Sequence, residues 1–375
     1  MRAVLAASWL LLTTLCGAQA SAYSEFNAGI ATQVRNDALA VQHFSAALAD
    51  PQLLANLRPV ALLNRATAYQ RQGKLDLALA DYSASLALRP TFDAYIRRSV
   101  IYRLMSQPEP AFADVTAAIA VRPDLAVGYQ LRSFFYSEQG RIDEAIGDLT
   151  TALAASPDDA AIFEARSNYY LYKGEYAAAM SDADKAIALS AGAPTSLLTK
   201  VAVYEAQGQF ATALDALERV LGKSPHVLLW VMKKGILQWE DHKYDAALAT
   251  FAQATQIAPS GAYPFLWLSL VRADAHLADT DAPDRALKVD VKKWPGPLVQ
   301  LYLGQSQPET IMAVAGGNVM LRKGQLCEAN FYIAQWQRAH GNLADATARL
   351  RAAVADCPPN FVERPAAANQ LKSLP

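Results

Sequence analysis

The chain has 375 residues, of which 53% are hydrophobic and 18% are charged. Such a composition can bury a large apolar core, so it excludes an intrinsically disordered protein. The 34 basic and 35 acidic side chains give a formal net charge of −1, which excludes strong electrostatic attraction to nucleic acid or to an anionic membrane surface.

The first residues have the features of an export signal. A basic residue, Arg2, precedes a mostly apolar stretch at Ala3–Leu15, and small residues then offer cleavage sites after Ala20 or Ala22. The apolar stretch is too short to span a bilayer comfortably. We therefore expect residues 1–20 to be a cleavable signal peptide, the mature protein to be periplasmic or secreted, and no transmembrane segment to remain after cleavage.

A repeat of about 34 residues runs through the middle of the chain. Its prolines follow one another at steps of 33, 34, 68 and 34 residues, at Pro90, Pro123, Pro157, Pro225 and Pro259. A tyrosine stands 21 residues before the proline position of five units, at Tyr69, Tyr102, Tyr136, Tyr170 and Tyr204. An alanine follows nine residues after each tyrosine, and a sixth unit keeps Ala247 but replaces the tyrosine with Gln238. This pattern resembles the tetratricopeptide repeat (TPR), a helix–turn–helix unit.

The resemblance implies an all-α fold, a TPR helix–turn–helix solenoid wound as a right-handed superhelix. The small alanine allows the two helices of one repeat to cross closely. Glycines four residues after the tyrosine would end the first helix in a left-handed conformation; they are Gly73, Gly140, Gly174 and Gly208. We expect a divergent TPR at residues 21–54 and an array of six repeats at 59–259.

The register is lost after Pro259 and returns near the end of the chain. Residues 260–326 look like a half repeat followed by an irregular helical insertion. Gly341 and Ala346 then stand at TPR offsets, so residues 327–360 are expected to form a C-terminal TPR. Residues 361–375 are left as a tail.

Two cysteines, Cys327 and Cys357, remain once the signal is removed. An even number of cysteines in an exported chain indicates a disulfide. In the resembling fold they would lie at the adjoining ends of the two antiparallel helices of the last repeat. There is no C-x-x-C pair and no histidine cluster beside them, so a redox or metal site is the weaker alternative.

Motifs for catalysis are missing from the sequence. The five histidines are scattered singly, and no H-E-x-x-H, G-x-S-x-G or G-x-G-x-x-G pattern occurs. We therefore expect no enzyme activity, no cofactor and no metal site, and a protein or peptide partner rather than nucleic acid.

In TPR proteins, fixed positions of each first helix line a concave groove that binds a partner segment. The resemblance places eight candidate groove residues at those positions: Gln130, Phe134, Glu164, Asn168, Tyr172, Glu205, Met232 and Trp239. Their aromatic, amide and acidic groups suit a peptide or helix with apolar anchors. The carboxylate clamp of some TPRs is not expected, because Asn168 alone matches it.

The last 80 or so residues resemble the C-terminal part of bacterial envelope TPR adaptor lipoproteins. The segments that carry this likeness run from Trp294 to Gly304 and from Cys327 to Tyr332. The chain lacks their lipidation site, so a soluble homologue is implied. The leading functional hypothesis is a periplasmic scaffold or adaptor in cell-envelope biogenesis. The alternative is an accessory structural subunit of a secretion or polysaccharide-export complex.

Overall fold

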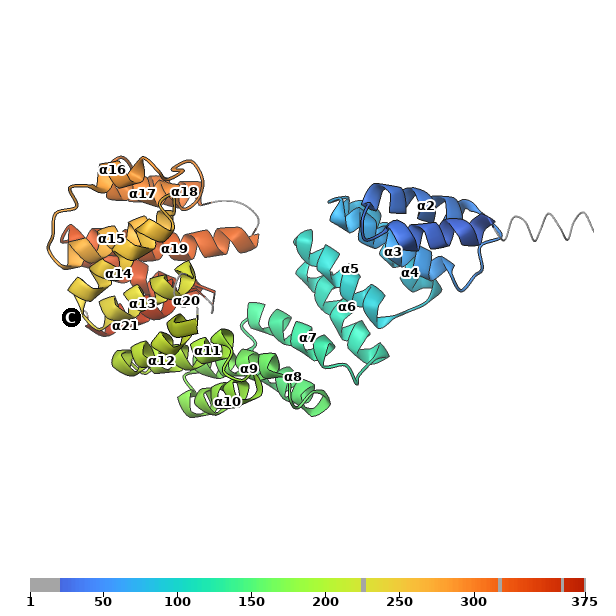
Figure 1. The fold of residues 1–375 in the computed structure, drawn as a ribbon, viewed down its shortest axis with the longest axis horizontal. Helices are drawn as coiled ribbons and strands as arrows, with labels where there is room; N and C mark the ends of the chain where they lie inside the picture. Colours follow the sequence, from blue (N-terminus) through green and yellow to red (C-terminus); the bar gives the residue numbers. More distant parts are fainter. Residues whose placement is uncertain (1–20, 224–226, 316–318, 359–360, 374–375) are drawn as a thin grey trace, which may run out of the picture. The chain divides into compact units, whose positions relative to one another are not determined.

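The computed structural model describes residues 21–223, 227–315, 319–358 and 361–373, and these form helices and no β-strand (Figure 1). The expected all-α fold of stacked helix pairs is confirmed. The chain divides into two compact units, unit 1 (residues 1–157) and unit 2 (residues 158–375), so the boundary falls within the predicted array. The predicted signal peptide, residues 1–20, lies outside the described residues.

Unit 1 starts with helical residues 21–32, which pack against the next helix through an edge-to-face contact of Phe26 and Phe44, with ring centroids 6.1 Å apart. Its remaining helices are α2 (Asp37–Ala49), α3 (Arg58–Arg71), α4 (Leu75–Leu88), α5 (Phe92–Leu104), α6 (Pro108–Val121), α7 (Ala126–Glu138) and α8 (Ile142–Ala155). From α3 onward they form three helix pairs, each a first helix packed on the second.

Unit 2 continues with three similar pairs and then departs from the pattern. The pairs are α9 (Ala160–Lys173) with α10 (Tyr176–Leu189), α11 (Pro194–Ala206) with α12 (Phe210–Lys223), and α13 (Leu228–Glu240) with α14 (Tyr244–Ile257). The other helices are α15 (Ala262–Asp274), α16 (Ala282–Ala286), α17 (Gly296–Tyr302), α18 (Pro308–Val314), α19 (Val319–Ala339), α20 (Leu343–Asp356) and α21 (Glu363–Ser373). The short helices α16, α17 and α18 form the insertion, and α17 packs on α15 and α19.

The residues predicted to shape each repeat take their expected places. The alanines at the helix crossings are fully buried, at Ala78, Ala111, Ala145, Ala179, Ala213, Ala247 and Ala346. The glycines that follow the first helices have φ between +72° and +78°, at Gly73, Gly140, Gly174 and Gly208. Ser106, His242 and His276 adopt the same left-handed conformation at the equivalent turns, so the backbone geometry persists even where glycine is absent.

An ion pair not predicted from the sequence joins the two helices in each of the first four repeats of the 59–259 array. In each, an arginine of the first helix makes two hydrogen bonds to an aspartate sixteen residues later. Both N–O distances lie between 2.7 and 2.9 Å in the pairs Arg65–Asp81, Arg98–Asp114, Arg132–Asp148 and Arg166–Asp182. The tyrosine four residues after each arginine lies beneath its guanidinium. These paired charges fix how each first helix sits on its second.

The fifth and sixth repeats replace this pair by another. Lys200 and Lys234 stand where the arginines would be, and they bind Asp184 and Glu218 of the preceding repeat, with N–O distances of 2.7 and 2.6 Å. In the sixth repeat the tyrosine and the aspartate have both changed. There the hydroxyl of Thr250 donates to Gln238 Oε1 at 2.7 Å. In the sixth repeat, the residues at the tyrosine and aspartate positions have therefore changed together, and they bond to each other.

Replacing Asp148 by alanine should destabilise unit 1 by roughly 2 kcal/mol, because it leaves the half-buried Arg132 without its carboxylate. The Asp148 side chain is 9% exposed in this pair. The matched control is Asp124→Ala, which removes an ion pair to Arg122 in which both side chains are more than half exposed. Its effect should stay within about 0.5 kcal/mol. Urea denaturation followed by circular dichroism measures both, and equal effects would contradict the structural role of Asp148.

The C-terminal region differs from the prediction at two places. Helix α19, the first helix of the last repeat, begins at Val319 rather than at Cys327. The predicted tail is helical, since α21 covers most of residues 361–375. The predicted disulfide is present between Cys327 in α19 and Cys357 at the end of α20, with Cα atoms 4.8 Å apart.

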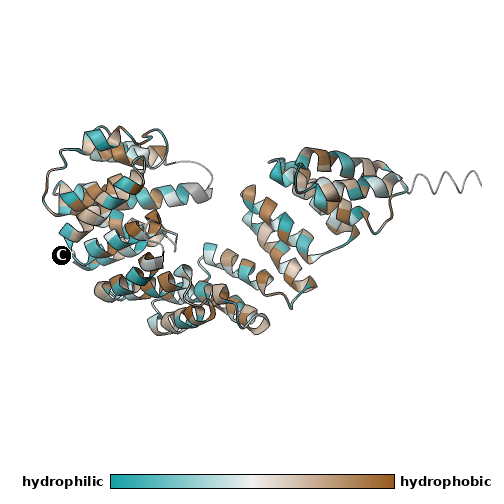
Figure 2. Ribbon diagram, viewed as in Figure 1, coloured by the Kyte–Doolittle hydropathy of each residue, from teal (hydrophilic) through white to brown (hydrophobic). Residues whose placement is uncertain are grey.

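Hydrophobic and hydrophilic residues alternate around the helices of both units, as Figure 2 shows. Within the described ranges, no helix has the combination of length and apolar character needed to cross a membrane.

Candidate protein-binding surfaces

The first helices of unit 1 carry an apolar surface that is open to solvent. Phe134 on α7 is 38% exposed, and Leu104 and Val127, at neighbouring groove positions, are 53% and 45% exposed. The guanidinium of Arg103 on α5 lies over the Phe134 ring, 5.4 Å from its centroid. Gln130, one helical turn before Phe134, is half-buried. We call these five residues the unit 1 face.

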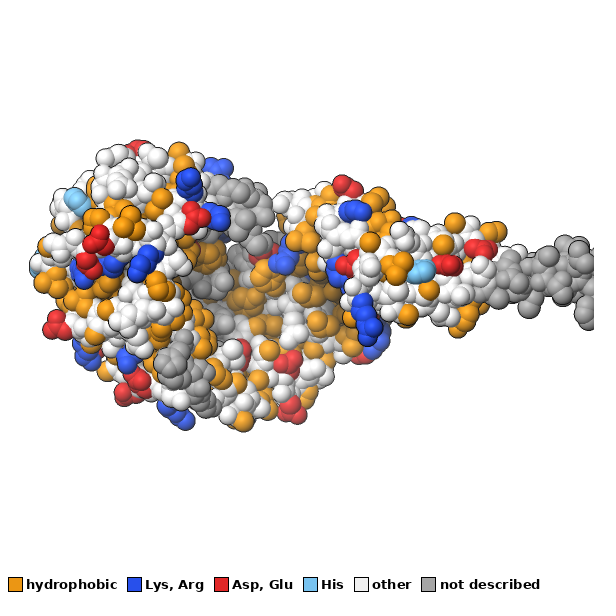
Figure 3. Space-filling view, turned by 45° about the horizontal axis from the view of Figure 1, so that its top comes forward, with side chains coloured by type: hydrophobic (Ala, Val, Ile, Leu, Met, Phe, Trp, Pro, Cys, Tyr) orange, Lys and Arg blue, Asp and Glu red, His pale blue; other side chains and the backbone are white. Residues whose placement is uncertain are grey.

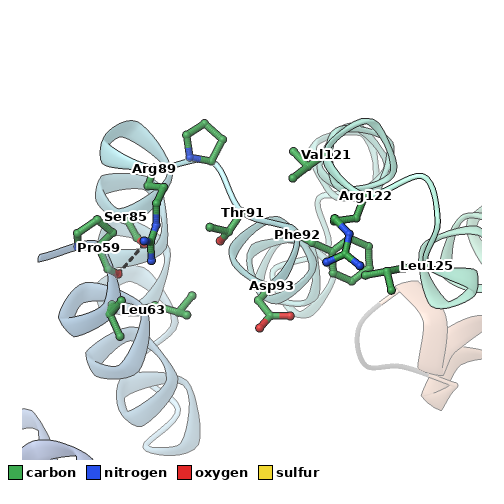
Figure 4. Close-up of a pocket in the computed structure, with 12 residues that line it drawn as sticks. Pro59, Leu63, Ser85, Arg89, Thr91, Phe92, Asp93, Val121, Arg122 and Leu125 are labelled. Carbon is green, nitrogen blue, oxygen red and sulfur yellow. Dashed lines mark hydrogen bonds between the residues drawn. The ribbon is translucent and has the colours of Figure 1, made fainter. Parts of the chain in front are cut away.

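A hollow of about 410 Å³ lies toward the start of the same first helices (Figure 4). Apolar side chains of α3, α5 and α6 line it, among them Leu63, Phe92 and Val121. Two arginines, Arg89 and Arg122, stand on opposite sides of it in Figure 4. Arg122 is paired with Asp124, and Asp93 also lines the hollow, so the charges at its edge are mixed and its apolar walls suit an apolar side chain.

Three candidate groove residues lie on α9 of unit 2, and they differ in what they contact. Asn168 is exposed. Glu164 accepts hydrogen bonds from the hydroxyls of Ser196 and Thr195 on α11. The guanidinium of Arg364 from α21 lies over one face of the Tyr172 ring, with Cζ 4.0 Å from the ring centroid, and Tyr172 remains 38% exposed. This surface is thus partly occupied by the chain itself.

The expectation that Glu205, Met232 and Trp239 line an open groove is not met in the structure. Their exposed fractions are 2%, 8% and 1%, so they lie in the interior of unit 2. Glu205 forms an ion pair there with Lys233 of α13. The physical reason is that the later helices of unit 2 cover these positions, which in a regular TPR array would face solvent.

Aromatic rings from four helices fill the centre of unit 2. Trp239 of α13 contacts Trp267 of α15 and Phe331 of α19, with ring centroids 5.3 and 6.5 Å away. Trp267 stacks on Phe251 at 5.6 Å. The Trp239 indole N–H donates to Asp274 at 2.6 Å, and Asp274 also pairs with Arg338. Helix α19 therefore packs directly on the first helices, where a partner would otherwise bind.

Buried carboxyl groups surround this aromatic cluster. Glu328 on α19 accepts hydrogen bonds from the Tyr263 hydroxyl and the Trp294 indole, and burial raises its pKa. Burial and then the nearby Glu328 raise the pKa of Glu363 from 4.5 to about 8. Burial and then Glu205 also raise the pKa of Glu240. These groups favour the protonated form, because a charge is poorly solvated in the interior.

The raised pKa of Glu363 predicts that unit 2 becomes less stable as pH rises from about 4.5 to about 8. In this window the unfolded chain has released the proton while the folded chain retains it, so folding becomes less favourable by roughly 1 kcal/mol per pH unit. Above pH 8 Glu363 is ionised in the folded protein as well, so it no longer makes the free energy of unfolding depend on pH. Glu363→Gln should flatten part of the decline, since Glu240 and Glu328 titrate in the same direction. Urea denaturation between pH 5 and 8.5 measures the free energy of unfolding of the wild-type protein and of Glu363→Gln. If this free energy changed equally with pH in both proteins, Glu363 would not be the group responsible.

The described part of the chain contains no group of three or more His, Cys, Asp or Glu side chains that could hold a metal ion. Lys and Arg are mixed with Asp and Glu on the face displayed in Figure 3.

The helix pairs of the structure coincide with segments that match models of a known repeat family. Models of the tetratricopeptide repeat match residues 59–92, 136–194 and 198–262. The chain is a tetratricopeptide-repeat protein. The TPR fold is also that of a crystal structure from Parabacteroides merdae ATCC 43184, described as a tetratricopeptide repeat protein. That protein is 15% identical and aligns over 66% of this chain and 98% of its own, with a TM-score of 0.55.

Two further solved structures match with lower TM-scores. Pseudomonas aeruginosa PilF is 19% identical over 59% of this chain and 99% of its own, with a TM-score of 0.47. YrrB, described as a TPR protein with an unusual peptide-binding site, is 16% identical over 49% of this chain and 95% of its own, with a TM-score of 0.38.

Proposed function

We propose that this TPR protein is a scaffold that binds a segment of a partner protein on the unit 1 face. The TPR fold supports a role in protein–protein interaction. The observation that carries the finer proposal is the contrast between the units. Unit 1 exposes Phe134 and Leu104 at groove positions, whereas Met232 and Trp239 at groove positions of α13 in unit 2 are buried among other side chains.

The chemistry of the unit 1 face defines the partner segment. Exposed apolar side chains beside one another bind apolar anchors by removing both from water. Arg103 over Phe134, with Arg89 beside the hollow, favours acidic groups next to those anchors. We infer a peptide with one or two large apolar residues flanked by carboxylates.

The proposed location is the bacterial periplasm, with a role in cell-envelope biogenesis. The signal-like pattern of residues 1–20 and the Cys327–Cys357 disulfide support an oxidising compartment outside the cytoplasm. Ala22 is 1% exposed and packs in the core of unit 1, so cleavage after Ala20 would keep this contact. The alternative is an accessory structural subunit of a secretion or polysaccharide-export complex.

Affinity capture from envelope extracts of the source organism tests this function when it compares matched variants. Phe134→Ala and Leu104→Ala should each lower recovery of the partner at least tenfold without changing thermal stability by more than a few degrees. Leu77→Ala is the control, because Leu77 is 48% exposed on the second helix α4. Recovery of several soluble envelope hydrolases supports the adaptor role, and recovery of one membrane complex supports the alternative. Equal capture by all three variants would overturn the proposed surface.

A further inference from the structure

The last helix of the chain, α21, is enclosed although its sequence is polar. Residues 363–373 read ERPAAANQLKS, with few large apolar side chains. Nevertheless, no side chain from 361 to 371 is exposed, and Ala366 and Ala367 are completely buried. The two alanines explain how this helix can lie so close to its neighbours, since they add no side chain beyond Cβ. A helix of this composition is not buried by its own hydrophobicity but by the shape of the surface around it.

Helix α21 contacts the groove positions of unit 2. Arg364, in its first turn, lies over one face of the Tyr172 ring on α9. Asn369 donates through Nδ2 to Glu240 Oε1 on α13 at 3.0 Å. Tyr172 and Glu240 occupy the same position in two different repeats, the thirteenth, which in TPR proteins faces the partner. Helix α21 packs mainly on α20, then on α19, and makes a smaller contact with α11; Figure 1 shows it beside α13 and α20.

The fit between α21 and this surface leaves one polar group unsatisfied. A hollow of about 320 Å³ remains beside the helix, lined by Phe210, Glu240, Asn369 and Lys372 among others. Glu240 Oε2 is buried without a hydrogen-bond partner among the described residues.

We propose that α21 is a ligand that the chain carries for itself. The surface formed by α9, α11 and α13 together with α19 and α20 is a helix-binding site, and residues 361–373 are its resident occupant. An outside helix can take the same place if it offers a cation in its first turn, small residues in the next and an amide donor after them. This inference concerns unit 2 alone and does not depend on the partner proposed for unit 1.

A nicked form of the full-length protein tests the proposal. A recognition site for a specific protease replaces residues 359 and 360, between Cys357 and α21, and the purified protein is cut there. A fluorescein-labelled peptide of residues 361–375 is then added, and its anisotropy is measured. We expect the labelled peptide to exchange into the nicked protein and not to bind the uncut one.

Peptide variants show whether the groove contacts hold the helix. The double change Arg364→Ala with Asn369→Ala removes a cation–π contact and a hydrogen bond to a carboxyl, so it should weaken binding at least tenfold. Lys372→Ala should weaken binding less than the double change, because Lys372 donates to Asn369 Oδ1 and only supports the contact of Asn369 with Glu240. Tyr172→Ala in the nicked protein should also weaken binding, whereas Phe134→Ala in unit 1 should have no effect.

Three outcomes would overturn the proposal. Cutting could abolish cooperative unfolding and leave no peptide binding, which would make α21 an inseparable part of the core. The uncut protein could bind the peptide as well as the nicked one, which would place the site elsewhere. The double variant could bind as tightly as the original peptide, which would show that Tyr172 and Glu240 do not recognise it.

Discussion

Trp239→Ala is expected to lower the free energy of unfolding of unit 2 by about 3–5 kcal/mol. The indole is 1% exposed and contacts Trp267 and Phe331, so its removal leaves a cavity that the surrounding rings cannot fill. The substitution also deprives Asp274 of its 2.6 Å hydrogen bond from the indole nitrogen. Urea denaturation followed by circular dichroism gives the change.

Two other variants separate the causes of this effect. Trp239→Phe keeps a ring but loses the N–H donor, so its effect should be intermediate. Trp336→Ala removes an indole that is half-buried and stacks on His340 at 4.0 Å, and should cost less than Trp239→Ala. If Trp239→Ala changed stability by less than about 1 kcal/mol, position 239 would face an open groove, as a regular TPR array predicts.

The second large decrease in the free energy of unfolding is expected when the Cys327–Cys357 disulfide is removed. The cysteines are 30 residues apart in sequence, and closing a loop of this length stabilises by roughly 3–4 kcal/mol on the chain-entropy model. Changing both Cys327 and Cys357 to alanine should therefore destabilise unit 2 by that amount. Alanine is chosen because Cys327 is completely buried and Cys357 is 4% exposed, so a serine hydroxyl would be left in the core.

Reductant provides the matched control for the disulfide prediction. Dithiothreitol should lower the urea midpoint of the wild-type protein to that of the double-alanine variant and leave the variant unchanged. Peptide mapping without reduction should recover the two cysteines in one linked fragment. Free thiols at both positions, or a wild-type midpoint that does not respond to reductant, would refute it.

The regular part of the fold could be predicted because the residues that determine the packing of each repeat lie within that repeat. The alanine at a crossing and the glycine after a first helix act locally, so their spacing identifies Ala145 and Gly140 without knowledge of the rest of the chain. The Arg132–Asp148 pair was available in the same way, since arginine and aspartate recur with the repeat, but its signal is hidden among ordinary surface charges. The disulfide followed from the antiparallel helices of the last repeat.

The interior of unit 2 could not be predicted because contacts between distant segments create it. Nothing near Trp239 in sequence shows that Trp267 and Phe331 will cover it. The sequence of α21 is even less informative, since its polar residues and alanines are typical of an exposed tail. Groove positions assigned from the repeat alone therefore fail at Glu205 and Met232, which are buried, whereas Phe134 is exposed and its role in a groove stays a prediction.

The contact between Arg364 and Tyr172 joins the last helix of unit 2 to its first. A chain made from its N-terminus forms the early repeats through local contacts, but it cannot complete this closure until Arg364 has emerged. Contacts between such distant residues slow folding, because the intervening chain must be ordered first. During synthesis, Tyr172 and Glu240 would thus remain without their contacts to α21, and a chain truncated before residue 361 would keep both of them uncovered.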